Sequence, residues 1–167
     1  MSAPRILRWL IPPLAAFLAD VASKAWILAL LPREGATKVV IPGFFNLSLG
    51  NNKGAIFGTL HGAPDWLRVG LFTVAGVAAI WYFGKEFLAD ATPRLERIAL
   101  GLILGGAAGN GLDRLLRGHV VDFLDFVFRG WHYWTFNVAD SCIVVGGILF
   151  GVSLLSAKKA PDAKAGE

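Results

Sequence analysis

Four apolar stretches dominate this sequence, and each is long enough to cross a lipid bilayer as a helix. They cover about residues 6–31, 67–84, 98–116 and 136–156. A helix that crosses a hydrocarbon layer of about 30 Å needs about 20 predominantly apolar residues. Only 17% of the chain is charged and 55% is hydrophobic, which is typical of a membrane protein. We therefore expect a single polytopic domain over residues 1–167, an all-α membrane protein with four transmembrane helices.

The first apolar stretch also has the outline of a secretory signal peptide, because Arg5 and Arg8 precede an apolar run from Trp9 to Ala19. Asp20 and Lys24 interrupt the stretch where a cleavage region would begin, and no clear A-x-A pattern follows. We therefore interpret this stretch as an uncleaved first span.

Basic residues give the orientation, since Lys and Arg are enriched in the cytoplasmic loops of membrane proteins. With four spans, both chain ends and the turn between the second and third spans lie on one side. The eight basic residues on that side are Arg5, Arg8, Lys85, Arg94, Arg97, Lys158, Lys159 and Lys164. We expect that side to be cytoplasmic, with residues 157–167 as a short disordered tail. The net charge of +4 is then an orientation signal, and no basic patch interleaved with aromatic residues indicates nucleic acid.

The polar residues that need an explanation gather at the opposite, outer boundary of the predicted domain. Asp20 and Lys24 are four residues apart, so they share a helix face and can pair. Asn110, Asp113 and Arg114 share one face at the end of the third stretch. Ionisable groups at membrane depth are costly and are functional candidates by default. A set of pairs that only holds helix ends together is the structural alternative.

Small residues and alternating residues predict two packing features. Gly101, Gly105 and Gly109 recur every four residues in the third stretch, a spacing that lets another helix approach closely. Leu47 and Leu49 alternate with polar residues in the outer loop between the first two spans, which indicates a strand.

Three carboxylates near the last span are candidates for chemistry. Asn137 can cap that helix, which places Asp140 in a first turn where the helix dipole favours a negative charge. Two carboxylates held close together cannot both ionise easily, so one can activate water while the other keeps a proton. Asp122 and Asp140 are the best candidates for such a pair. If the segment around Asp122 is extended, Asp125 points to the opposite face, but the sequence leaves Asp125 open.

Other chemistries receive less support from the residues. The chain has no H-E-x-x-H and no G-x-S-x-G motif, and Ser23 and Lys24 would point about 100° apart on a helix. Cys142 is the single cysteine, and His119 and His132 have no metal-ligand spacing, so we expect no metal site. A proton-coupled transporter would need polar residues along a whole pathway, and a structural assembly factor would tolerate Asn in place of the carboxylates.

Five motifs occur in the order found in bacterial lipoprotein signal peptidase, or signal peptidase II, which the chain resembles from residue 20 to residue 141. They are DVASK (20–24), NNKGAIFG (51–58), GGAAGNGLDR (105–114), GHVVDF (118–123) and FNVADS (136–141). The last three motifs together are highly specific.

This resemblance implies a membrane aspartic endopeptidase that removes the signal peptide of prolipoproteins just before a diacylglyceryl-modified cysteine. It implies Asp122 and Asp140 as the catalytic pair and leaves Asp125 outside it. The substrate-binding residues would be Asn52, Asn110, Arg114 and Asn137. The supporting residues would be Asp20, Lys24, Gly54 and Asp113.

The resemblance also implies a setting for the enzyme. The outer loop would form a small extracytoplasmic β-sheet that cradles the substrate. The protein would lie in the bacterial inner membrane as a monomer, with its site at the outer leaflet boundary, in contact with lipid and lipidated substrate. No metal or organic cofactor is required for this chemistry.

Overall fold

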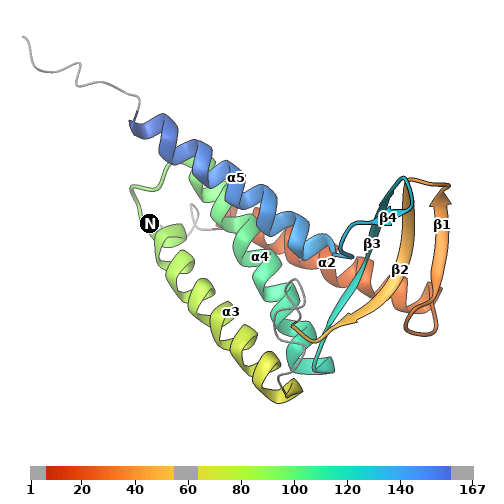
Figure 1. The fold of residues 1–167 in the computed structure, drawn as a ribbon. Helices are drawn as coiled ribbons and strands as arrows, with labels where there is room; N and C mark the ends of the chain where they lie inside the picture. Colours follow the sequence, from red (N-terminus) through yellow and green to blue (C-terminus); the bar gives the residue numbers. More distant parts are fainter. Residues whose placement is uncertain (1–6, 55–63, 159–167) are drawn as a thin grey trace, which may run out of the picture.

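The computed structural model describes residues 7–54 and 64–158 of the chain, which form a helical bundle with a small sheet at one end (Figure 1). The helices are α2 (Ile11–Leu30), α3 (Asp65–Leu88), α4 (Arg94–Arg117) and α5 (Val138–Lys158). The strands are β1 (Thr37–Ile41), β2 (Phe45–Asn52), β3 (Val120–Phe128) and β4 (Trp131–His132). Most of the tail predicted at residues 157–167 lies outside the described residues.

Three helical segments in the described part of the chain are long and apolar enough to cross a membrane. They are Leu7–Leu30, Trp66–Leu88 and Val138–Ser156. The third predicted span corresponds to α4, which also has 24 residues but carries charged residues at both ends. The polar last third of α4 lowers its average hydropathy. Length and hydropathy therefore support the first, second and fourth expected spans, but not the third.

The central helix α4 contacts α2, α3 and α5. A Cβ atom added at Gly105 would lie 2.3 Å from the carbonyl oxygen of Pro13, and one at Gly109 would lie 2.4 Å from Asp20 Oδ2. A Cβ atom at Gly101 would lie 2.9 Å from the side chains of Pro12 and Pro13, at the start of α2. The prediction that these glycines allow close helix packing is therefore confirmed.

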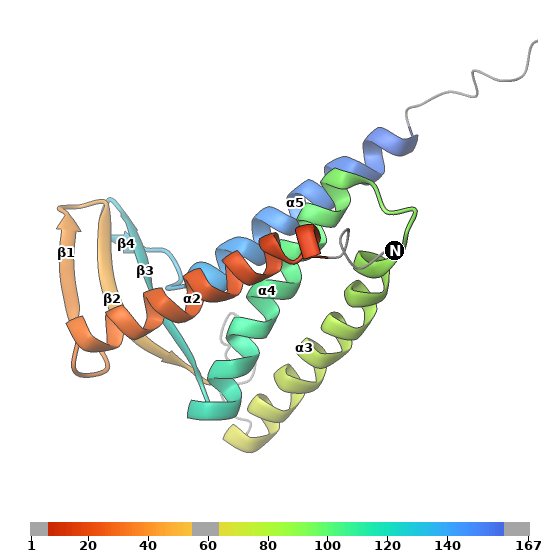
Figure 2. The same cartoon turned by 180° about the vertical axis from the view of Figure 1, so that it is seen from behind.

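The sheet is antiparallel, with the strand order β1-β2-β3-β4, and it packs against the end of α2 (Figures 1 and 2). The predicted strand around Leu47 and Leu49 is β2, and both side chains are buried. The buried side chains shared by α2, β2 and β3 are Ile27, Leu31, Leu47, Leu49, Val121 and Phe123. This apolar cluster fixes how β3, which carries Asp122 and Asp125, lies relative to the helices.

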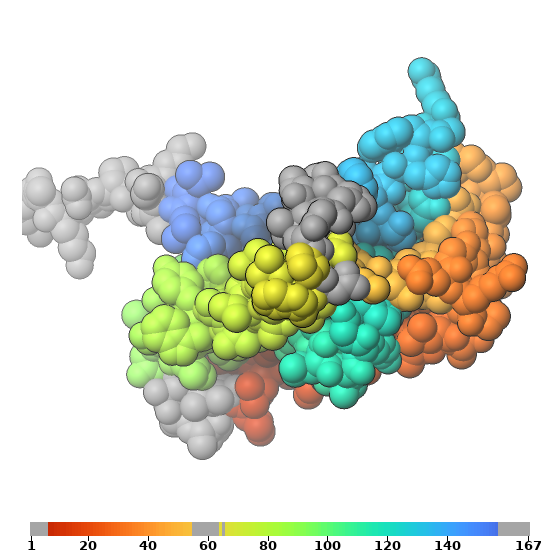
Figure 3. Space-filling model, turned by 60° about the horizontal axis from the view of Figure 1, so that its bottom comes forward, coloured from red at the N-terminus to blue at the C-terminus, as the bar shows by residue number. Residues whose placement is uncertain are grey.

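Large apolar side chains cover the outside of the helices. On α3, Trp66 is 74% exposed and Val74 is 67% exposed, and Ile148 on α5 is 61% exposed. Exposed apolar area on this scale marks a surface that a partner or a membrane covers. The end of α3, the start of α4 and the end of α5 lie together, away from the sheet (Figure 1). At the other end of the bundle, the start of α3 (yellow) lies beside the end of α4 (green), and the sheet lies to one side of them (Figure 3).

Candidate active site

A buried ion cluster lies at the end of the bundle next to the sheet. The Nζ atom of Lys24 is 2.8 Å from Asp20 Oδ2 and 2.9 Å from Asp113 Oδ2, and it donates a 2.9 Å hydrogen bond to Asn110 Oδ1. Lys24 is 2% exposed and Asp20 is fully buried. Two carboxylate oxygens and one amide oxygen therefore surround the buried ammonium group, so its charge is paired as a buried charge requires. The predicted contact between Asp20 and Lys24 is present, and Asp113 joins it.

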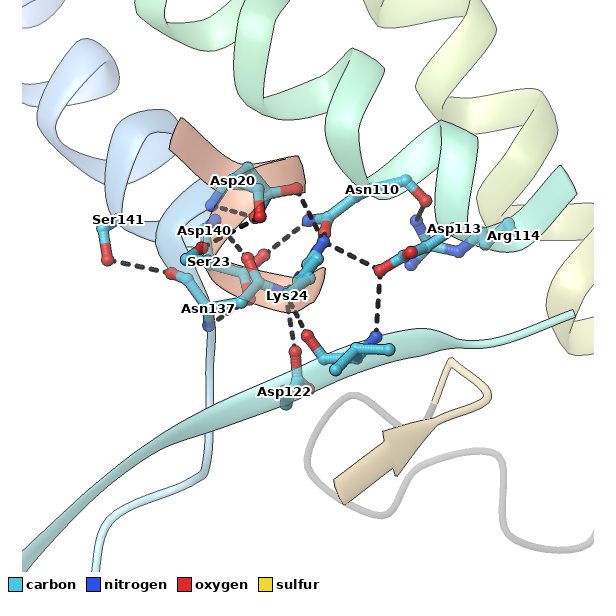
Figure 4. Close-up of polar contacts among 12 residues, drawn as sticks. Asp20, Ser23, Lys24, Asn110, Asp113, Arg114, Asp122, Asn137, Asp140 and Ser141 are labelled. Carbon is cyan, nitrogen blue, oxygen red and sulfur yellow. Dashed lines mark hydrogen bonds and ion pairs between the residues drawn. The ribbon is translucent and has the colours of Figure 1, made fainter. Parts of the chain in front are cut away.

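The same cluster holds the two chain segments that carry the candidate carboxylates (Figure 4). Asp20 Oδ1 accepts a 2.9 Å hydrogen bond from the backbone N–H of Ala139, in the first turn of α5. Asp113 Oδ2 accepts a 3.1 Å hydrogen bond from the backbone N–H of Val121 in β3, and Asp113 Oδ1 pairs with Arg117. The ion cluster thus ties α2 and α4 to β3 and to the start of α5.

Asn137 lies between Asp122 and Asp140 and contacts both. Its Nδ2 donates a 2.7 Å hydrogen bond to Asp122 Oδ1, and its Oδ1 accepts a 2.9 Å hydrogen bond from the backbone N–H of Asp140. The second contact is the predicted helix cap. Asn110 adds a 2.8 Å hydrogen bond from its Nδ2 to Asp140 Oδ1. Two buried amides therefore hold carboxylates from β3 and α5 around one polar centre.

Asp122 also receives a hydrogen bond from the last residue of β2. Asn52 Nδ2 donates to Asp122 Oδ2 at 3.0 Å, so each oxygen of Asp122 has an amide donor. Asn52 Oδ1 accepts a 2.8 Å hydrogen bond from the backbone N–H of Gly54, which has φ +95°. The turn that follows β2 thereby aims the Asn52 amide at the carboxylate.

The surroundings of Asp122 favour its protonated form. Burial, and next the negative charge of Asp140, raise the pKa of Asp122 to about 7, against the opposing hydrogen bonds from Asn52 and Asn137 and the charge of Lys24. Near neutral pH the Asp122 carboxyl therefore spends much of its time protonated beside Asp140, which is half-buried. Such a pair can hold one proton between two carboxyl groups.

Arg114 lies near both candidate carboxylates and reaches the site from α4. Its charge interacts with those of Asp140 and Asp122. Its Nη1 donates a 3.3 Å hydrogen bond to the carbonyl oxygen of Asn110, and its guanidinium lies 5.6 Å from the ring centre of Phe72. The half-buried guanidinium is thus a cationic group placed beside the pair.

Asp125 belongs to a separate cluster, as expected for a residue three positions along an extended strand. Its Oδ2 accepts hydrogen bonds from Asn46 Nδ2 at 3.1 Å and from Ser48 Oγ at 3.0 Å, and His132 Nδ1 lies 2.9 Å from its Oδ1. Burial alone would raise the pKa of Asp125, but the hydrogen bonds from Asn46, His132 and Ser48 outweigh it and lower that pKa. The strand conformation that separates Asp125 from Asp122 agrees with the sequence prediction.

Sequence reasoning did not find the polar partners of Asp125 or the aromatic partner of Arg114. Asn46 and Ser48 alternate with Leu47 and Leu49 in β2, so the period of two was a usable signal for one polar face. No pattern marked Phe72, because it lies within an apolar helix outside every motif.

Comparison with known proteins gives the family. A family model described as "Signal peptidase (SPase) II" matches residues 13–156. The chain is 45% identical over 141 residues to a "Lipoprotein signal peptidase" of Burkholderia vietnamiensis, covering 84% of this chain and 83% of the relative. It is 41% identical over 156 residues to the one of Solibacter usitatus, covering 92% and 94% respectively.

A solved structure described as a "Bacterial membrane enzyme" has the same fold. It superposes with a TM-score of 0.79 at 30% sequence identity, over 97% of this chain and 94% of its own. A second structure of the same description, at 1.9 Å resolution, superposes with a TM-score of 0.77. Since the family model and the relatives cover most of the sequence, this chain belongs to the signal peptidase II family, the lipoprotein signal peptidases.

Proposed function

We propose that Asp122 and Asp140 are the catalytic pair with which this peptidase removes the signal peptide of prolipoproteins, just before a diacylglyceryl-modified cysteine. The observation that carries this proposal is Asn137, whose one side chain contacts Asp122 and caps the turn that holds Asp140. The family assignment supports the substrate class.

The environments of the two carboxyl groups suggest separate roles. Asp140, the more exposed of the two, is the general base that takes a proton from the attacking water. Asp122, with a pKa of about 7, holds the proton that it donates to the oxygen of the scissile carbonyl. The water oxygen bonds to the carbonyl carbon. As the C–N bond then breaks, the proton taken by Asp140 passes to the leaving amine. Asp122 takes back a proton from one hydroxyl of the intermediate, which leaves a carboxylic acid and returns both carboxyl groups to their starting states.

The amide and guanidinium groups around the pair orient the carboxyl groups and the peptide. Asn52 and Asn137 each donate to one oxygen of Asp122, which fixes the plane of that carboxyl group. Arg114 and Asn110 lie beside Asp140, where donors can hold substrate carbonyl groups extended across the pair. The ion cluster of Asp20, Lys24 and Asp113 supports the site. Asp113 accepts a hydrogen bond from the backbone of β3, and Asp20 accepts one from the backbone of α5.

The membrane arrangement that fits this function has four spans, with α4 as the third. Burial of Asn110 and Asp113 against α2, α5 and β3 keeps the polar part of α4 away from lipid. Lys85, Arg94 and Arg97 lie in or next to the turn between α3 and α4, away from the sheet, which favours that end as cytoplasmic. The sheet and the site then face the outer leaflet of the inner membrane, where a monomer meets lipidated substrate and water together.

The direct test is cleavage of a synthetic lipobox peptide by the purified full chain in detergent. The peptide carries a diacylglyceryl group on its cysteine, and a matched peptide carries an unmodified cysteine. We expect one cut, before the modified cysteine, and little or no cutting of the unmodified peptide. Equal cutting of both peptides would contradict the proposed substrate class, and full activity of Asp122→Asn would contradict the catalytic pair.

A further inference from the structure

We propose that Phe72 of α3 is a positioning residue for this site, and that it acts through Arg114 and through the turn at Gly54. The inference rests on the function proposed above for Asp122 and Asp140. No sequence motif includes Phe72, and the helix that carries it faces outward along most of its length.

The ring of Phe72 lies directly against the backbone of Gly54. A Cβ atom at Gly54 would be 2.4 Å from Cδ2 and 2.7 Å from Cε2 of that ring, so any side chain at this position would force the ring or the turn to move. The φ of +95° also favours glycine at this position. Gly54 donates to Asn52 Oδ1, and Asn52 donates to Asp122. The ring therefore supports the turn that aims an amide at one of the two carboxyl groups.

The same ring also supports Arg114. The guanidinium carbon of Arg114 lies 5.6 Å from the centre of the Phe72 ring, within the range of a cation–π contact. An Arg side chain has several rotatable bonds, and a flat contact with an aromatic face restricts where its guanidinium lies. Two groups that reach the carboxylates from different elements, Asn52 and Arg114, thus depend on one aromatic side chain.

Phe83 on the same helix provides a matched control. Like Phe72 it is half-buried, and its ring makes an edge contact with Phe150 of α5 at 6.1 Å. It lies eleven residues further along α3, roughly 16 Å at the helical rise. A Phe→Leu change at Phe83 therefore removes an aromatic contact of α3 without touching the site.

The experiment compares Phe72→Leu, Phe72→Tyr and Phe83→Leu in the full chain, with kcat and KM measured on the diacylglyceryl peptide. We expect Phe72→Leu to lower kcat/KM about tenfold, while Phe72→Tyr, which keeps the ring, and Phe83→Leu stay within about twofold of wild type. If Phe72→Leu inserts poorly, Phe72→Met keeps the apolar bulk and serves the same comparison.

A second arm separates positioning from simple packing. In an Arg114→Lys background the flat guanidinium is gone, so Phe72→Leu should cost at least threefold less than it does in wild type. A purely structural ring would give the same fold-loss in both backgrounds. An equal fold-loss in both backgrounds, or wild-type kcat/KM in a folded Phe72→Leu protein, would overturn the positioning role of Phe72 and leave the proposed function intact. Asp122→Asn is measured in parallel, and full cleavage by that variant would overturn the proposed function and this inference together.

Discussion

Asn137 donates a 2.7 Å hydrogen bond from its side-chain amide to Asp122 Oδ1, although the two residues lie on different elements. Asn137 precedes the first turn of α5, and Asp122 lies in β3. The contact exists only because the chain folds back after β4 and brings the start of α5 against the strand. The following predictions depend on this junction.

Asp122 and Asp140 should act as one unit. Asn has nearly the shape of Asp but cannot serve as a general base, so each of Asp122→Asn and Asp140→Asn should lower turnover by about 10²–10⁴ or more. The double variant should be hardly slower than either single variant. Single-turnover cleavage and peptide binding are measured together, because binding should survive in all three. Independent, multiplying losses would contradict a shared mechanism.

Asn137 should matter for both stability and turnover. Its side chain is fully buried, and Asn137→Ala would leave Asp122 Oδ1 and the backbone N–H of Asp140 without their partner. We expect a loss of about 1–3 kcal/mol in the free energy of unfolding, together with a large loss of turnover. Ser141→Ala is the matched control, since the Ser141 hydroxyl donates to the backbone oxygen of Asn137 rather than to its side-chain amide. Similar losses of stability and turnover in both variants would mean that the stability of the first turn of α5, rather than the Asn137 amide, supports activity.

Asp122 should make the stability of the folded protein depend on pH up to about neutrality. Because the pKa of Asp122 is raised to about 7 in the folded chain, the folded state binds its proton more tightly than the unfolded state does. The contribution of Asp122 to stability is then present below its unfolded pKa and is lost as pH rises through about 7. The Tm of wild type minus that of Asp122→Asn should fall between about pH 4 and pH 7.

The same ionisation should appear in the kinetics. If Asp122 delivers the proton, kcat/KM should decline as pH rises above about 7. A pH–rate profile of wild type on the diacylglyceryl peptide is the measurement, with a substrate concentration well below KM. A profile that is flat from pH 6 to pH 9 would contradict the role assigned to Asp122.

Asp125 should be needed for stability and not for cleavage. Its hydrogen bonds go to Asn46, Ser48 and His132, and they lower the pKa of Asp125. Its stabilising contribution is therefore present above its unfolded pKa and lost as pH falls. Asp125→Asn should keep most of its turnover while its Tm falls. An inactive Asp125→Asn beside an active Asp122→Asn would show that Asp125, rather than Asp122, is the catalytic carboxylate of β3.

The orientation in the membrane has its own test. A reporter fused after Lys159 should read cytoplasmic, and one inserted at His61 should read external, because eight of the 16 Lys and Arg residues lie at the two chain ends and around the turn between the second and third predicted spans. The opposite pattern would exclude the proposed topology, and with it the position of the site at the outer leaflet.

The sequence by itself determined the membrane class, the family motifs and several local features of this protein. Apolar length predicted the helices, the four-residue spacing predicted the pairing of Asp20 with Lys24, and the position of Asn137 before a helix predicted its cap. Each of these signals depends on residues within a few positions of one another. The sequence also predicted a fourth span at α4. The polar last third of α4 lowers its hydropathy, and three helical segments in the described part of the chain are apolar enough to span.

Only the tertiary structure decided which groups meet. Asp122 and Asp125 have the same chemistry and similarly apolar neighbours in sequence, and the conformation of β3 and its register with β2 separate them. Lys24 finds Asp113 and Asn110, and Phe72 finds Gly54 and Arg114, because four elements pack at one end of the bundle. Local periodicity reports how a segment buries its own side chains. Contacts between distant segments depend on how those segments pack together, and no local pattern encodes that.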